Sequence, residues 1–79
     1  MSQETQDRVI RVIHEVTELP CAEIAAAAAL VDLPNWDSLM HLNMVLGLER
    51  EFGINFNIME MTEVNSVGAA VRLIEAKTA

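Results

Sequence analysis

Ser38 is the one serine in a stretch that contains little else able to do chemistry, LPNWDSLMHL (residues 33–42). Asp37 precedes it and an apolar run follows. An aspartate and a serine before such a run are typical of a helix start, where a side-chain oxygen accepts a backbone N–H. The simplest interpretation is therefore a helix cap. A hydroxyl at this position can also act as a nucleophile, or as the attachment point of another group.

Nucleophilic catalysis would need a base close to Ser38. His41 lies three residues further on, one turn away if the segment is helical. A hydrolytic serine also needs a group that orients the base and an oxyanion hole, and the chain has no G-x-S-x-G elbow. His14, the other histidine, falls in the middle of an earlier helical segment. We therefore predict no catalytic residues and no enzymatic activity.

Attachment of a phosphate-linked group makes fewer demands on the chain. The start of a helix presents unpaired N–H groups and a partial positive charge, which favour a covalently bound phosphate. The base for the reaction can come from the enzyme that performs it. From the residues alone, the cap and the attachment point both remain open for Ser38.

Hydrophobic periodicity predicts four helices and no strands around this serine. They span residues 3–18, Asp37 or Ser38 to Phe52, Asn57 to about Thr62, and a closing segment that starts after Ser66. Ser2 is the expected cap of the first helix, and Leu19-Pro20 ends it. Gly53 suits the left-handed position that ends the second helix.

The segment between the first two helices, residues 21–36, contains the alanine run Ala25–Ala29. Alanine favours helix, but so short a run is marginal without packing, and we expect a loop with some helical content. Ile24, Leu30 and Leu33 are the expected anchors of this loop. The fold class is then all-α: a small four-helix bundle with three main helices, one short helix and a long first loop, in a single domain of residues 1–79.

The second predicted helix carries two apolar stripes at about 100° per residue. The inward stripe consists of His41, Met44, Val45, Leu48 and Phe52. Leu39, Leu42 and Leu46 form a second stripe on another side. This second stripe either binds a partner protein or packs beneath the alanine-rich loop.

The chain has 79 residues and a formal net charge of −7, with five basic residues. Nucleic-acid binding needs clustered lysine and arginine, so we predict no nucleic-acid partner. The negative charge either steers the protein toward basic patches on partners or only keeps it soluble.

Several further classes are excluded by what the sequence lacks. A single cysteine, Cys21, forms no internal disulfide, and metal-ligand spacing is absent, so we predict no metal. No apolar run approaches the roughly 20 residues of a membrane span, and the polar start does not resemble a signal peptide. Without a sustained heptad pattern we expect a monomer, located in the cytoplasm.

Three stretches of the sequence together resemble a known family. Asp37-Ser38-Leu39 is followed by an apolar helix that ends in LEREFGI (48–54), and the segments LVDLPNW (30–36) and VNSVGAAVRLIEA (64–76) flank that unit. The chain resembles acyl carrier proteins and the related carrier domains of polyketide and peptide synthesis. The resemblance covers nearly the whole chain.

The resemblance implies that Ser38 bears a covalent 4′-phosphopantetheine group. A phosphopantetheinyl transferase would place it there, with Asp37 helping to hold Mg²⁺ in the complex. The thiol of the group would carry acyl or aminoacyl groups as thioesters from acyl-loading to acyl-consuming enzymes. We predict that these partners contact Leu39, Leu42, Leu46 and Glu49.

The chain departs from fatty-acid carriers just after the serine, where those proteins are usually acidic and this one has Met40, His41 and Asn43. The departure favours a dedicated carrier in a specialised pathway over housekeeping fatty-acid synthesis. The alternative function is a carrier-like helical interaction module without the prosthetic group.

Overall fold

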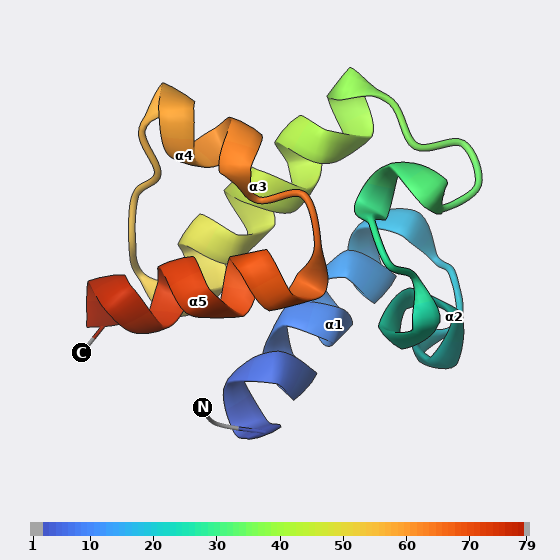
Figure 1. Cartoon of the computed structure of the whole chain (residues 1–79), viewed down its shortest axis with the longest axis horizontal. Helices are drawn as coiled ribbons and strands as arrows, with labels where there is room; N and C mark the ends of the chain where they lie inside the picture. The colour runs from blue at the N-terminus through green and yellow to red at the C-terminus, as the bar shows by residue number, and fades with distance from the viewer. Residues whose placement is uncertain (1–2, 79) are drawn as a thin grey trace.

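The computed structural model describes residues 3–78, and these form five α-helices, one 3-10 turn and no strand (Figure 1). The elements are α1 (Gln3–Thr17), α2 (Cys21–Ala26), η1 (Leu30–Asp32), α3 (Ser38–Phe52), α4 (Ile58–Glu63) and α5 (Val67–Thr78). The all-α prediction and its three main helices are confirmed. The predicted cap Ser2 lies outside the described residues.

The three long helices enclose the core, with α1 packed against both α3 and α5 (Figure 1). Buried apolar side chains from all three meet there, together with Ile24, Leu30 and Leu33 of the first loop. On α3 the inward stripe is confirmed for Met44, Val45 and Leu48, which are fully buried. His41 and Phe52, predicted on the same stripe, are half-buried.

The first loop contains a helix that is displaced from the alanine run. α2 starts at Cys21 and ends at Ala26, and Ala27 is already extended. Pro20 precedes the helix with φ −59°, and its carbonyl oxygen accepts the N–H groups of Glu23 and Ile24. Because Ile24 is fully buried, packing of that side chain places the helix, and alanine propensity alone does not.

Two residues other than glycine adopt the left-handed conformation and shape the ends of this loop. Glu18, at φ 62°, ends α1, where the Nδ1–H of His14 donates to the carbonyl of Leu19 at 2.6 Å. Asn35, at φ 61°, turns the chain three residues before Ser38. Asparagine tolerates this conformation better than most residues.

The short helix α4 is held by polar contacts at its start. Asn57 and Glu60 form a reciprocal capping box, and Lys77 Nζ of α5 lies 2.8 Å from Glu60 Oε1. The hydrogen bond from Lys77, together with the N–H of Asn57, lowers the pKa of the Glu60 carboxyl below its usual value. The predicted cap Asn57 is thereby confirmed.

The other predicted helix ends agree with the structure. The Ser66 hydroxyl oxygen accepts the N–H of Ala69 at 3.0 Å at the start of α5. Gly53 follows α3 at φ 65°. Both residues act as the sequence predicts.

A glycine sets the distance between α1 and α3. A β-carbon built on Gly47 would lie 2.8 Å from Val12 Cγ1, closer than methyl groups pack. Val12 is β-branched and almost fully buried, so it cannot turn away easily. The close approach of the two helices therefore requires glycine at this position.

We predict that Gly47→Ala destabilises the bundle. The clash costs about 1–3 kcal/mol and is offset only in part by about 1 kcal/mol of better helix propensity. Urea unfolding measures the change. Gly68→Ala is the matched control, since its nearest atom is Arg72 Nη1 at 3.7 Å, and we expect it to raise the free energy of unfolding by up to about 1 kcal/mol. A Gly47→Ala protein as stable as that control would contradict the close approach.

Candidate functional site

Ser38 is the first residue of α3, and its neighbour Asp37 is the cap. Asp37 Oδ1 accepts the N–H of Met40 at 2.8 Å, and the Asp37 carbonyl accepts the N–H of His41 at 2.9 Å. Ser38 is exposed, and its hydroxyl makes no hydrogen bond to any other residue within 3–78. Of the two predicted caps, Asp37 is therefore the one that caps α3, and the serine hydroxyl is free to react.

His41 does not form a catalytic pair with Ser38 through its Nε2. That nitrogen lies 2.7 Å from the carbonyl oxygen of Met61 in α4, and because a carbonyl only accepts, Nε2 carries the hydrogen. The His41 and Trp36 rings form a T-shaped pair, with 6.0 Å between ring centroids and planes at 87°. Half-buried and held in this way, His41 connects α3 to α4.

A shallow hollow of about 310 Å³ opens beside the serine. It is lined by Val31, Trp36, Asp37, Ser38 and His41. Sequence analysis did not assign Val31 or Trp36 to the site. The only signal available was a single tryptophan two residues before the serine.

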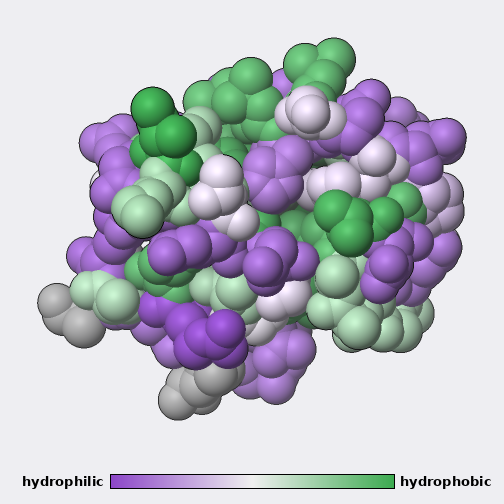
Figure 2. Space-filling model, turned by 45° about the horizontal axis from the view of Figure 1, so that its top comes forward, coloured by the Kyte–Doolittle hydropathy of each residue, from purple (hydrophilic) through white to green (hydrophobic). Residues whose placement is uncertain are grey.

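The second apolar stripe of α3, here called the α3 ridge (Leu39, Leu42, Leu46), faces outward. These side chains are 65%, 41% and 44% exposed, so the first loop does not cover them. Val31, Ile58 and Met59 add further exposed apolar side chains on η1 and α4. Figure 2 shows hydrophobic surface gathered along the edge where α4 lies and α3 begins.

Glu49, the fourth predicted partner residue, has a role in the fold. Its Oε2 accepts the N–H of Phe56 at 2.7 Å, which ties the last turn of α3 to the segment before α4. The side chain is half-buried. Its contact with partner proteins stays a prediction.

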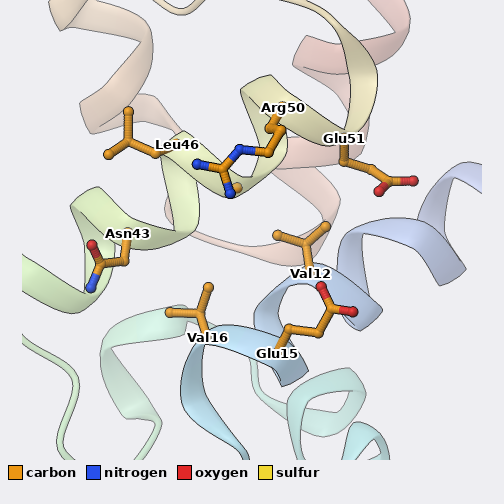
Figure 3. A pocket seen from close by; sticks show the side chains of 8 residues that line it. Val12, Glu15, Val16, Asn43, Leu46, Arg50 and Glu51 are labelled. Atoms are coloured by element: carbon orange, nitrogen blue, oxygen red, sulfur yellow. The ribbon is translucent and has the colours of Figure 1, made fainter.

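An open groove of about 470 Å³ runs between α1 and α3 (Figure 3). Val12 and Val16 of α1 and Leu46 and Gly47 of α3 line it, together with charged side chains from both helices. Among these, Glu51 pairs with Arg8 at 2.9 Å. Leu46 therefore belongs both to the α3 ridge and to one wall of the groove.

The candidate site is chemically sparse apart from the serine. Among residues 3–78 no three His, Cys, Asp or Glu side chains are grouped so as to hold a metal ion. No helix in the same range is long and apolar enough to cross a membrane. What the site offers is one exposed hydroxyl at a helix start.

Comparison with known proteins identifies the family. Residues 7–74 match the family model described as "Phosphopantetheine attachment site". The chain belongs to this family. It is a carrier protein that bears a covalently attached 4′-phosphopantetheine, and the family's carriers work with synthase and transferase enzymes. A similar protein is polyketide-8 synthase acyl carrier protein 2 of Streptomyces avermitilis, 26% identical over 72 residues, which are 91% of this chain and 83% of that protein.

The residues around Ser38 fit a phosphate-linked group. The hydroxyl is exposed and unbonded, and the helix start contributes N–H groups and a partial positive charge. The hollow beside it leaves room for the first atoms of an attached chain. The family resemblance found in the sequence is confirmed.

We predict that Asp37→Ala costs about 0.5–2 kcal/mol of stability because α3 loses its cap. Ser38→Ala should stay within about 0.5 kcal/mol of the unmodified parent protein, because its hydroxyl makes no bond within residues 3–78. Thermal or urea unfolding of both variants checks the difference. If Ser38→Ala costs as much as Asp37→Ala, the serine shares the capping role.

Proposed function

We propose that Ser38 is the residue that carries the 4′-phosphopantetheine arm. The observation that supports this most directly is the exposed, unbonded hydroxyl at the first residue of α3. The other described serine, Ser66, uses its hydroxyl as a helix cap. Ser38 is the serine whose modification leaves the fold intact.

Loading would be carried out by a phosphopantetheinyl transferase. The Ser38 oxygen forms an ester bond to the phosphorus next to pantetheine in coenzyme A, the pyrophosphate bond breaks, and adenosine 3′,5′-bisphosphate leaves. The hydroxyl proton passes to a base of the transferase. Asp37 Oδ1 is occupied by Met40, and we propose that Oδ2 supports the transferase's Mg²⁺ in the complex.

The thiol of the attached arm supplies thioester chemistry, and this chain supplies the docking body. We propose that acyl-loading and acyl-consuming enzymes meet the α3 ridge and Glu49, with no catalysis by the carrier itself. The net charge of −7 favours partners with basic patches. The ridge supports this proposal because three exposed leucines within two turns of one helix form an unusual apolar surface.

The cargo we propose is an acyl group of a specialised pathway in the cytoplasm, carried by a monomer. The similar polyketide synthase carrier supports an acyl cargo. Met40, His41 and Asn43 lie where fatty-acid carriers usually have acidic residues, so enzymes of fatty-acid synthesis would find fewer charges to bind there. The loading enzyme, more than any pocket in this bundle, sets the identity of the group.

We predict that coenzyme A, Mg²⁺ and a broad-specificity transferase add one phosphopantetheinyl group to the protein, as measured by intact mass. Ser38→Ala should abolish the gain because the accepting oxygen is lost. Ser66→Ala is the control: it removes a cap and costs about 0.5–2 kcal/mol, but loading continues. Asp37→Asn keeps a cap oxygen while removing the charge, and should slow loading without unfolding the helix.

The loading assay also separates the two functions that the sequence left open. A parent protein that stays unmodified while a known carrier is fully converted would contradict the carrier function. That result would favour the alternative function, a helical interaction module without the prosthetic group.

A further prediction concerns the α3 ridge. Leu46→Glu should leave the stability within about 1 kcal/mol, since the side chain is already 44% exposed, while transfer to and from partner enzymes slows. Val45→Ala should instead destabilise the bundle by about 1–3 kcal/mol, because Val45 is fully buried.

Ala76→Glu adds the same charge at an exposed site on α5 and controls for charge alone. Unfolding of the bundle by Leu46→Glu would contradict the outward assignment of the ridge. Equal slowing by Ala76→Glu would show that net charge, and not the ridge, matters to partners.

A further inference from the structure

The hollow beside Ser38 combines an apolar side and a hydrogen-bonding side. Val31 is 70% exposed, and Trp36 is half-buried with part of its indole open to solvent. His41 lies one helical turn from the serine and lines the same hollow. Ser38 lines the same hollow, so a group attached to its hydroxyl can cover the exposed valine and indole surface.

The orientation of His41 leaves one ring nitrogen available. Nε2–H donates to the Met61 carbonyl at 2.7 Å, which fixes the ring against α4. Nδ1 has no hydrogen-bond partner among residues 3–78. With a hydrogen on both ring nitrogens, the Nδ1–H can donate a charge-assisted hydrogen bond to an anionic oxygen placed next to it.

The carboxylate of Asp37 also lines the hollow, and an anion placed there must tolerate it. Its Oδ1 is turned to the N–H of Met40 at the start of α3. The N–H groups at the start of α3 therefore oppose this negative charge. A singly charged phosphodiester held by Ser38 fits that balance better than a free dianion would.

A phosphopantetheine arm has a charged group next to the serine and an apolar group shortly after it. A phosphodiester comes first, bonded directly to the serine oxygen and thus within one helical turn of His41. A carbon with two methyl groups comes next, and its apolar surface matches Trp36 and Val31. The polar amides and the thiol follow further out.

We propose that this hollow is the resting subsite for the near end of the arm. Nδ1–H of His41 donates to a phosphodiester oxygen, and Trp36 and Val31 cover the dimethyl carbon. The inference rests on the proposed attachment at Ser38 and adds the three side chains that hold the arm there. The thiol end stays free to reach partner enzymes.

The single tryptophan of the chain, with no tyrosine present, gives a clean optical probe of the hollow. Apo and loaded protein, with loading verified by intact mass, are compared by acrylamide quenching of Trp36 fluorescence. We expect the quenching constant to fall by roughly a factor of two on loading, because the arm covers most of the ring surface still open to solvent. In ¹⁵N spectra the ring nitrogens of His41 should shift on loading.

His14 is the internal control for those spectra. It also has one ring nitrogen on a backbone carbonyl, at 2.6 Å from Leu19, but does not line the hollow. Its resonances should stay in place. Equal shifts at both histidines would report a general change of the protein and overturn the inference.

Two variants test the assignment of the side chains. Val31→Ser removes apolar surface at an exposed position and should load fully while losing much of the protection of Trp36. His41→Gln keeps a donor toward Met61 but lacks the imidazole, and should load with weaker protection; unfolding curves exclude a folding defect as the cause.

The outcomes separate this inference from the proposed function. No mass gain would contradict attachment. Full loading with unchanged Trp36 quenching and unchanged His41 resonances would overturn the resting subsite while attachment stands. Protection that is identical in the parent, Val31→Ser and His41→Gln would also overturn it, because the arm would then shield Trp36 without these contacts.

Discussion

The first turn of α3 has backbone N–H groups without partners inside the helix, and Asp37 Oδ1 accepts the one from Met40 at 2.8 Å. A serine is as good a cap as an aspartate, so two adjacent candidates compete for one role. Because Asp37 is the cap, the hydroxyl of Ser38 lies at the helix start without a hydrogen bond that the fold needs. The same arrangement keeps the positive end of α3 beside that hydroxyl, where a phosphate ester is favoured.

The remainder of the bundle holds α3 in a fixed position. Its buried side packs into the core through Met44, Val45 and Leu48, and Gly47 lets α1 approach closely on another side. The leucines of the α3 ridge are left to solvent. A carrier protein depends on this division, since one helix must be both anchored and accessible.

Much of this arrangement follows from local sequence. The apolar spacing in residues 3–18 and 38–52 is sufficient for two long helices, and Gly53, Asn57 and Ser66 mark helix ends through side-chain or backbone chemistry that acts within a few residues. The family resemblance adds the prediction that Ser38 bears a 4′-phosphopantetheine group.

What the sequence could not supply depends on distant contacts. The sequence predicts Ile24 as an anchor and some helical content in the first loop, but the bounds of α2 depend on the burial of that side chain. The hollow joins Val31 of η1 to His41 of α3, and the ring of His41 is oriented by a carbonyl twenty residues further along the chain. The sequence predicts that Glu49 contacts partner proteins, but it does not reveal the hydrogen bond from Phe56 N–H, which depends on the path of the chain after Gly53.

None of the residues in α4, Ile58–Glu63, is fully buried. Met61 packs partly buried against the core, and the other contacts of the helix are polar: its capping box, the Glu60–Lys77 pair and the His41–Met61 bond. Elements held mainly by solvent-accessible polar contacts have low local opening free energies. Amide protons of α4 should therefore exchange before those of α1 and α3. Each such opening also releases the imidazole from its backbone acceptor, so the two fluctuations form a single cooperative event.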